Sequence, residues 1–190
     1  DVDIIISDDG LQHYRLSRDL ELLILDGERR FGNQLLLPAG PLRELTARQQ
    51  HVDFIIVNGE AHEGEFQMRL EPTQFVPVSP SSKQVFDPLK PAVAIAGIGN
   101  PERFFTTLRH ANVQLIKTKA FEDHQAFSVK ALMEVADIAP LLMTEKDAVK
   151  CRDFAKENWW YLAVDAKLTD NFDQLFIYKI HQVMDVKQGN

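Results

Sequence analysis

Two adjacent carboxylates, Asp8 and Asp9, follow the apolar run Val2 to Ile6 after a single serine near the start of the sequence. Such a run predicts a buried parallel strand, because strands covered on both faces read as continuous apolar stretches. Ligands of open α/β sheets bind beyond the carboxyl ends of the strands, and magnesium takes one or two carboxylates together with water and phosphate oxygens. We therefore predict that Asp8 and Asp9 hold magnesium; the alternative is an Asx turn before Gly10.

A histidine and a segment of mixed basic and apolar character follow this pair. His13 lies four residues after Asp9 and either orders the carboxylates or a substrate, or serves as a capping or core residue. Arg43 is able to hold a phosphate in a bidentate fork, whereas an Arg43–Glu44 surface ion pair would be worth little. The leucines at 35–37 belong in the core or, if exposed, mark a contact with lipid or protein.

Two further polar segments follow predicted strands in the second half of the sequence. Asp123 lies next to His124, a combination that suits general-base support or metal ligation; the alternative is a solvated approach to a helix. Thr144 has the position of a helix N-cap, with Asp147 three residues later. This spacing favours helix capping over a phosphate contact.

Composition narrows the possible classes of protein. The chain has 190 residues, 45% of them hydrophobic, a formal net charge of −7 and one cysteine. The negative charge argues against a nucleic-acid partner, although local clusters of arginine suggest a small anionic ligand. The single cysteine excludes an intrachain disulfide, and no apolar run approaches the roughly 18 to 20 residues that span a bilayer. No glycine-rich phosphate loop of the form G-x-x-x-x-G-K-[ST] occurs in the sequence.

The pattern of apolar runs predicts an α/β protein in three segments, 1–64, 65–91 and 92–190. The first contains strands at 2–6, 20–25 and 54–57, and the second contains a β-hairpin over 65–78 followed by a proline-rich linker. From residue 92 strands and helices alternate, which predicts a smaller α/β domain with its own parallel sheet. We expect its strands at 92–96, 113–117, 141–143 and 161–164. We expect four helices: one that starts at 101, one over 128–138, one that follows the strand 141–143 and ends at about 156, and one over about 170–184.

Six motifs, taken in order along the chain, are together similar to one known family, tetraacyldisaccharide 4′-kinase, the lipid A pathway kinase of Gram-negative bacteria. They are Ser-Asp-Asp-Gly-Leu-Gln-His (7–13), Asp-Gly-Glu-Arg-Arg-Phe-Gly-Asn (26–33), Leu-Pro-Ala-Gly-Pro-Leu-Arg-Glu (37–44), Gly-Ile-Gly-Asn-Pro-Glu-Arg-Phe-Phe (97–105), Phe-Glu-Asp-His (121–124) and Thr-Glu-Lys-Asp-Ala-Val-Lys (144–150). The resemblance covers essentially the whole chain but only the later part of the family's length.

The resemblance implies ATP-dependent phosphorylation of the 4′-hydroxyl of a tetraacylated disaccharide 1-phosphate at the cytoplasmic face of the inner membrane. It also implies a fold in which part of a P-loop kinase sheet is joined through a two-stranded hairpin to a smaller α/β domain. ATP and Mg²⁺ are the expected cofactors, and the lipid is the expected partner.

The resemblance also assigns roles to residues that bind metal and cofactor. Asp8 and Asp9 match the Walker B position that handles magnesium, directly or through water. Arg43 and Glu44 fall where the family has functional residues near the phosphates and the metal. We place His13 with them in the expected cofactor-binding set.

The expected catalytic residues lie in the later segment. His124 matches the family histidine that partners a catalytic aspartate across a domain cleft, and Asp123 lies beside it. The family's phosphate loop, membrane-associating segment and proposed catalytic base all precede the position that matches Asp1. We therefore expect an N-terminally truncated fragment that is inactive alone, since the phosphate loop supplies most of the positioning in phosphoryl transfer.

Other functions remain open on the residues alone. A P-loop enzyme that acts on a soluble substrate would share most of these features. A non-catalytic nucleotide- or phosphate-binding module would keep only half of a site. A magnesium-dependent phosphohydrolase built from Asp8, Asp9, His13 and His124 would need no ATP.

Overall fold

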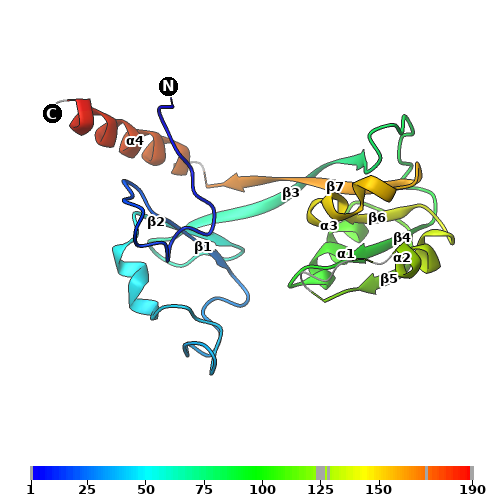
Figure 1. Ribbon diagram of the computed structural model, residues 1–190, viewed down its shortest axis with the longest axis horizontal. Helices are drawn as coiled ribbons and strands as arrows, with labels where there is room; N and C mark the ends of the chain where they lie inside the picture. Colours follow the sequence, from blue (N-terminus) through cyan, green and yellow to red (C-terminus); the bar gives the residue numbers. More distant parts are fainter. Residues whose placement is uncertain (1, 123–126, 128, 170, 189–190) are drawn as a thin grey trace. The chain divides into compact units, whose positions relative to one another are not determined.

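The computed structural model describes residues 2–122, 127, 129–169 and 171–188 and shows a mixed α/β protein (Figure 1). The chain divides into two compact units: unit 1 comprises Asp1–Leu70 and Ala166–Asn190, and unit 2 comprises Glu71–Asp165. The elements in order are β1 (Leu22–Asp26), η1 (Thr46–His51), β2 (Phe54–Asn58), β3 (Phe66–Pro77), β4 (Ala92–Ala96), α1 (Pro101–His110), β5 (Leu115–Ala120), α2 (Val129–Ala136), β6 (Leu141–Thr144), α3 (Glu145–Cys151), η2 (Arg152–Phe154), β7 (Trp159–Leu168) and α4 (Phe172–Gln188).

Unit 2 has the parallel strands predicted for the later part of the sequence, but they do not form a sheet of their own: all seven strands of the described residues belong to one sheet in the order β1-β2-β3-β7-β6-β4-β5. β4 pairs in parallel with β5 on one side and β6 on the other, and β6 pairs in parallel with β7. All five residues of β4 are buried. The start of α1 is also as predicted, because the Asn100 side chain accepts a hydrogen bond from the Arg103 amide and Pro101 occupies the first helical position.

The predicted cap at Thr144 is confirmed, and it is part of a larger buried network. The Thr144 hydroxyl accepts from the Asp147 amide at 3.2 Å and donates to Asp147 Oδ2 at 2.8 Å. The fully buried Asp147 carboxylate also accepts from the Gly97 amide at 2.8 Å and from Lys150 Nζ at 3.0 Å. Asp147 therefore ties the end of β4 to the start of α3. One turn later, burial raises the pKa of the Cys151 thiol to about 11.

Unit 1 contains β1, β2 and the first part of β3, which form one end of the seven-stranded sheet, and an aromatic core. β1 pairs in parallel with β2 over five residue pairs, and β2 pairs in parallel with the start of β3. Phe54 of β2, Phe66 of β3, and Phe172 and Phe176 of α4 pack against one another with ring centroids 5.2–5.9 Å apart. The helix predicted near the end of the sequence is thus part of this unit, and its aromatic face covers the sheet.

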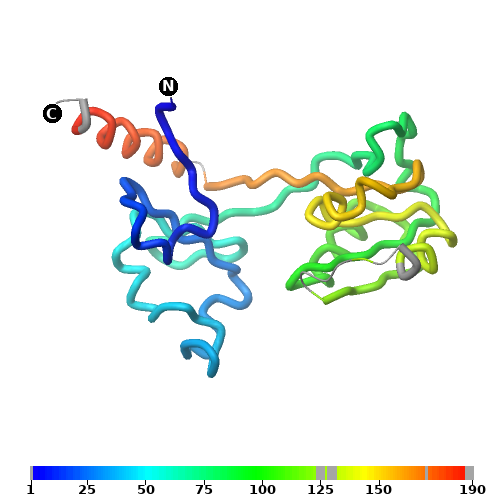
Figure 2. Tube along the Cα trace, viewed as in Figure 1, coloured from blue at the N-terminus to red at the C-terminus, as the bar shows by residue number. Residues whose placement is uncertain are grey.

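The strand predicted over Val2 to Ile6 is wrong. This segment follows an irregular path, dark blue in Figure 2, and Ile5 and Ile6 are 85% and 90% exposed. An apolar run becomes a strand only when a neighbour pairs with its backbone N–H and C=O groups. Within the described residues, the sheet begins at β1, and no strand pairs with residues 2–6.

The hairpin predicted over 65–78 is also wrong, because β3 runs without a turn through Pro72. Its antiparallel neighbour comes from far along the sequence. Thr169 N donates to Gln67 O at 3.0 Å, the Thr73 hydroxyl to Ala163 O at 3.2 Å, and Val78 N to Trp159 O at 3.0 Å. β7 therefore fills the place that a local hairpin partner was expected to take. The domain boundaries predicted from the sequence remain a prediction.

Among the helices in the described part of the chain, none combines the length and apolar character that crossing a membrane requires.

Candidate active site

The loop after residue 6 presents its two carboxylates at the surface of unit 1. Asp9 has a φ of 49°, in the left-handed region that aspartate tolerates better than most residues. Behind the loop, Arg18 Nη1 donates to the carbonyl oxygens of Gly10 and Leu11, each at 2.8 Å. These bonds hold the loop in a turn although the segment before it forms no strand.

Four side chains form one connected polar cluster, namely those of Asp9, Gln12, Arg43 and Glu44. Arg43 Nη1 lies 3.1 Å and 3.0 Å from the two carboxylate oxygens of Asp9, and it also donates to Gln12 Oε1 at 3.5 Å. The amide of Gln12 in turn donates to Glu44 Oε2 at 2.9 Å. Gln12 thus contacts both Arg43, through the longest of these bonds, and Glu44.

The exposure of this cluster indicates that it contributes little to stability. The side chains of Arg43 and Asp9 are 58% and 72% exposed. An ion pair so open to water contributes about 0–1 kcal/mol. The remaining N–H groups of Arg43 have no hydrogen-bond partner within the described residues, so a guanidinium that already faces a carboxylate can still bind an anion.

The other predicted site residues are not part of this cluster. Asp8 is exposed, and neither its side chain nor that of His13 has a hydrogen-bond partner among the residues the structure describes. His13 takes part in the turn through its backbone, with its amide 2.9 Å from Gly10 O. Asp123 and His124 lie outside the described residues.

The loop that leads to Arg43 exposes its leucines. Leu35, Leu36 and Leu37 are 52%, 42% and 62% exposed, so the expectation of burial is wrong for all three. The loop folds on Asn33, whose side chain donates to Ala39 O at 2.9 Å and accepts from the Leu35 amide at 3.1 Å. A Cβ at Gly40 would overlap Asn33 and the Leu35 carbonyl, so only glycine fits this close approach.

Basic residues also gather at the carboxyl end of β1. The Asp26 side chain accepts from the amides of Glu28 and Arg29 at 3.0 Å and 2.9 Å, which starts the following turn. Asp26, Arg29 and Arg30 line a hollow of about 240 Å³ together with Gly32 and Pro41. This is the edge of a parallel sheet at which ligands bind in α/β folds.

Arg30 is held at this edge by Glu65. Nη1 and Nη2 of Arg30 donate to Oε2 and Oε1 of Glu65, and the His62 amide donates to Glu65 Oε2 at 2.8 Å. The hydrogen bond from Arg30 is the main reason that the pKa of Glu65 lies below its ordinary value. A bidentate pair of this kind fixes the orientation of Arg30.

Sequence reasoning singled out Arg43 and Asp9, which the structure brings into contact, but gave no role to the residues that join and support them. Gln12 is part of the motif at 7–13, but sequence reasoning assigned it no role. A glutamine three residues after an aspartate does not indicate that its side chain will connect two other residues, here Arg43 and Glu44. Arg18 and Glu65 also received no role, because their contacts depend on loop conformation and on sequence separations of 7 and 35 residues.

The donor set fits magnesium better than a transition metal. Within the described residues no group of three or more His, Cys, Asp or Glu side chains is placed to hold a metal ion. Asp8 and Asp9 offer exposed carboxylate oxygens. Magnesium uses one or two carboxylates and completes its shell with water and phosphate oxygens, so these two residues suffice on the protein side.

A comparison with solved structures defines the class of protein. A crystal structure titled as the "apo" form of LpxK from Aquifex aeolicus in complex with ATP matches with a TM-score of 0.66 and 25% sequence identity, over 92% of this chain and 56% of that chain. The fold of this chain is therefore that of part of an α/β kinase of this type.

The family follows from comparisons of sequence. The family model described as tetraacyldisaccharide-1-P 4′-kinase matches residues 1–181. Proteins named tetraacyldisaccharide 4′-kinase from Shewanella woodyi and Shewanella halifaxensis are 74% and 60% identical, over 100% and 97% of this chain. The chain belongs to the tetraacyldisaccharide-1-P 4′-kinase family. It spans 56% and 57% of the lengths of these two relatives.

Proposed function

We propose that the protein carrying these residues transfers a phosphoryl group from ATP to the 4′-hydroxyl of a tetraacyldisaccharide 1-phosphate. The observation that carries the proposal is the cluster of Asp9, Arg43, Gln12 and Glu44. It joins a carboxylate suited to magnesium with a guanidinium suited to phosphate, in a chain whose family is named for this reaction. Phosphoryl transfer depends mainly on positioning and on electrostatic stabilisation, and this cluster supplies groups for both.

In this proposal Asp8 and Asp9 hold magnesium, which when bound neutralises charge on the phosphates of ATP. Arg43 contacts a phosphate oxygen through the N–H groups that it does not use on Asp9. Gln12 keeps Arg43 and Glu44 in place. His13 remains a proposed member of the cofactor-binding set, although its imidazole makes no hydrogen bond within the described residues.

His124 and Asp123 are proposed as catalytic residues on the resemblance of their motif to the family. A histidine that partners a base near the acceptor hydroxyl would move a proton during transfer. We further propose that the reaction takes place at the cytoplasmic face of the inner membrane and that membrane contact involves a segment preceding these residues in the family. The 190 residues alone are proposed to lack kinase activity.

The exposed leucines support a lipid acceptor over a soluble one. Leu35, Leu36 and Leu37 lie in the loop that ends at Arg43, and all three are more than 40% exposed. An apolar surface beside a phosphate-binding side chain suits a molecule with acyl chains attached to a polar sugar. The same surface has no obvious use with a soluble acceptor.

A kinetic comparison of two arginine variants tests the proposal. In a full-length family member carrying these residues, Arg43→Gln is expected to lower kcat/KM for 4′-phosphorylation by about 100-fold or more, as loss of a charge-stabilising donor does in other enzymes. Arg69→Gln is the control, because Arg69 is an exposed residue of β3 outside the cluster. Equal activity of the two variants would refute the role of Arg43, and formation of no 4′-phosphate by the unaltered protein would refute the function.

A further inference from the structure

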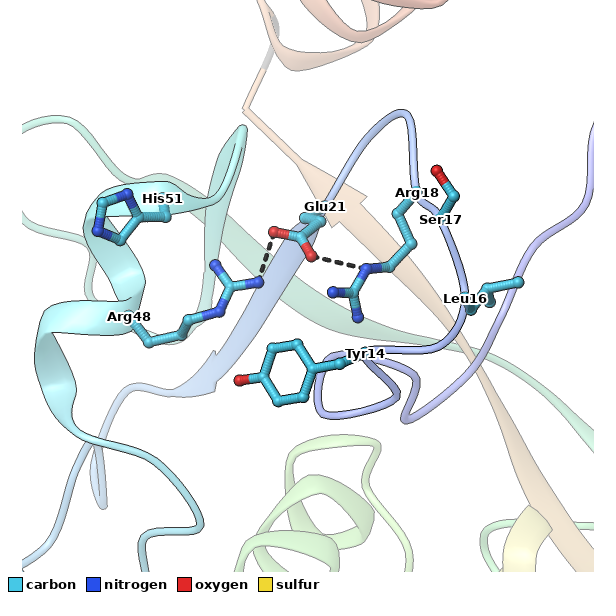
Figure 3. A pocket seen from close by; sticks show the side chains of 7 residues that line it. All are labelled: Tyr14, Leu16, Ser17, Arg18, Glu21, Arg48 and His51. Atoms are coloured by element: carbon cyan, nitrogen blue, oxygen red, sulfur yellow. Dashed lines mark hydrogen bonds and ion pairs between the residues drawn. The ribbon is translucent and has the colours of Figure 1, made fainter.

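A second basic hollow lies at the amino end of β1, apart from the proposed active-site cluster (Figure 3). It has a volume of about 490 Å³ and is lined by Tyr14, Leu16, Ser17, Arg18, Glu21, Arg48 and His51. Glu21 directly precedes β1, whereas the hollow with Asp26 lies at the other end of this strand, about 16 Å away at the usual rise per residue. None of the lining residues belongs to the cluster around Asp9 and Arg43.

Two guanidinium groups face one another across this hollow. Glu21 lies between them: its Oε1 is 2.8 Å from Arg18 Nε and its Oε2 is 2.6 Å from Arg48 Nη2. Figure 3 shows the two guanidinium groups on either side of Glu21, with the ring of Tyr14 beneath. The three charged side chains are only 14–19% exposed, so the arrangement is fixed by its surroundings.

The hollow retains hydrogen-bond donors and positive charge after these contacts. Glu21 neutralises one of the two arginines, which leaves one net positive charge. Arg18 Nη2 and the Nε and Nη1 groups of Arg48 have no partner among the residues that the structure describes. Because both oxygens of Glu21 are already bonded, the remaining N–H groups are available to a ligand that only accepts hydrogen bonds.

A tetrahedral oxyanion suits these donors. Planar guanidinium groups bind phosphate through paired N–H groups, and two of them on opposite sides can contact different oxygens of the same group. Ser17 and His51 at the rim add polar side chains able to donate. The exposed Tyr14 and Leu16 give one wall an apolar character, which suits a phosphate carried by a larger molecule.

We propose that this hollow binds a phosphate group, with Arg18 and Arg48 as its two ligating side chains. The phosphate comes either from a free phosphate anion or from the head group of an anionic phospholipid, since both present the same oxygens. This site is additional to the proposed kinase site. Its ligand neither reacts there nor has to be a substrate.

Binding measurements on a full-length family member carrying these residues test the proposal with two probes. Inorganic phosphate is titrated calorimetrically, and vesicles of phosphatidylglycerol are compared with vesicles of phosphatidylcholine in sedimentation. Arg48→Gln is expected to weaken binding of at least one phosphate probe about tenfold or more, as loss of a charged hydrogen bond does. Arg15→Gln is the matched control, because it removes the same charge from an exposed position that lies between two lining residues, Tyr14 and Leu16, but does not itself line the hollow.

A second variant guards against misfolding. Arg48→Lys keeps the charge beside Glu21 but loses the planar fork, and it is expected to bind more weakly than the unaltered protein and more tightly than Arg48→Gln. Binding of inorganic phosphate that depends on Arg48 assigns the hollow to a free anion, and dependence seen only with phosphatidylglycerol assigns it to a lipid head group. Equal effects of Arg48→Gln and Arg15→Gln, or no binding of either probe, would overturn the proposal. Loss of kinase activity in Arg43→Gln would leave this result unchanged.

Discussion

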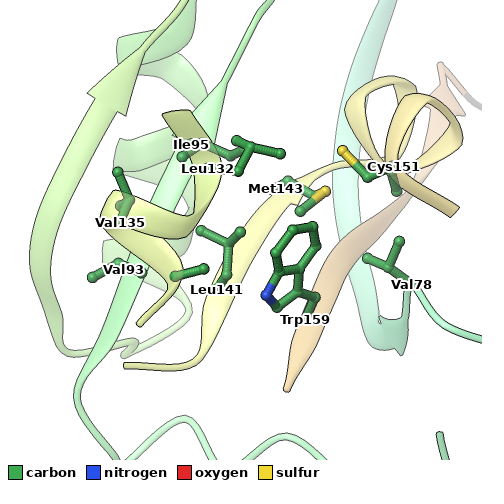
Figure 4. Packing of buried hydrophobic residues seen from close by; sticks show 11 residues of the cluster. Val78, Val93, Ile95, Leu132, Val135, Leu141, Met143, Cys151 and Trp159 are labelled. Atoms are coloured by element: carbon green, nitrogen blue, oxygen red, sulfur yellow. The ribbon is translucent and has the colours of Figure 1, made fainter. Parts of the chain in front are cut away.

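β4 of unit 2 and β1 of unit 1 are both short parallel strands of five mainly apolar residues, yet their surroundings differ. Ile95 of β4 is fully buried, whereas Ile24 of β1 is 54% exposed. Figure 4 shows Val93 and Ile95 packed with Leu132 of α2 and Trp159 of β7. The alternate residues of β4 pack against α1. β4 is therefore covered on both faces, and β1 is not.

The difference shows that an apolar run predicts a strand better than it predicts burial. Parallel strands are expected to be covered on both faces by helices. In unit 1, α4 contributes Phe172 and Phe176 to a small aromatic core, and Ile24 lies outside it. The Asp9–Arg43 pair of this unit is correspondingly exposed, whereas the Asp147 carboxylate of unit 2 is fully buried.

The largest expected effect comes from a buried carboxylate in unit 2. Asp147→Ala removes the acceptor for the Gly97 amide, the Thr144 hydroxyl and Lys150. Because it leaves buried donors unpaired, it should lower the free energy of unfolding of this unit by about 3–5 kcal/mol. Asp9→Ala in the exposed cluster should change it by less than about 1 kcal/mol. Urea unfolding of both variants tests the contrast, and similar losses would contradict it.

A pair of identical substitutions tests the comparison between the two strands directly. Ile95→Ala should cost about 2–5 kcal/mol of unfolding free energy, because it creates a cavity in a core that cannot collapse fully. Ile24→Ala should cost no more than about 1 kcal/mol, since the side chain is half exposed. If Ile24→Ala proved as destabilising as Ile95→Ala, β1 would be covered in solution by something outside these residues.

A smaller effect, dependent on pH, is expected at Glu65. The pKa of Glu65 is lowered, mainly by the hydrogen bond from Arg30, so the folded state favours the ionised carboxylate. Its stabilising contribution, on the order of 1–2 kcal/mol, is present at neutral pH and is lost as the pH falls through the lowered pKa. Glu65→Gln should therefore be less stable than the unaltered protein at pH 7, and the gap should narrow toward pH 3. If the difference in unfolding free energy between the two proteins increased at acid pH, the stated direction of the pKa shift of Glu65 would be wrong.

The sequence predicted those parts of the fold that depend on short-range signals. Asn100 and Pro101 mark the start of α1, and Thr144 with Asp147 marks the start of α3, because capping is decided within one helical turn. The strand predicted over Val2 to Ile6 and the hairpin predicted over 65–78 were wrong for the opposite reason. Whether a strand forms, and with which partner, depends on segments far away in the sequence.

Residue types in the candidate site could be singled out from the sequence, but their contacts could not. Asp9 and Arg43 were singled out by residue type and position, and the structure brings them together across 34 residues. Gln12, which joins Arg43 to Glu44, and Arg18, which supports the loop, act through loop geometry. No periodic pattern encodes such geometry.

A double-mutant cycle on Asp9 and Arg43 tests the central claim most directly, namely that this pair acts as one unit in phosphoryl transfer. Turnover of a tetraacyldisaccharide 1-phosphate with ATP and magnesium is measured for Asp9→Asn, Arg43→Gln and the double variant in a full-length family member carrying these residues. Because residues that act as a unit have non-additive effects, the double variant should be about as slow as the slower single variant. Additive losses, or single variants with unaltered kcat, would contradict the claim.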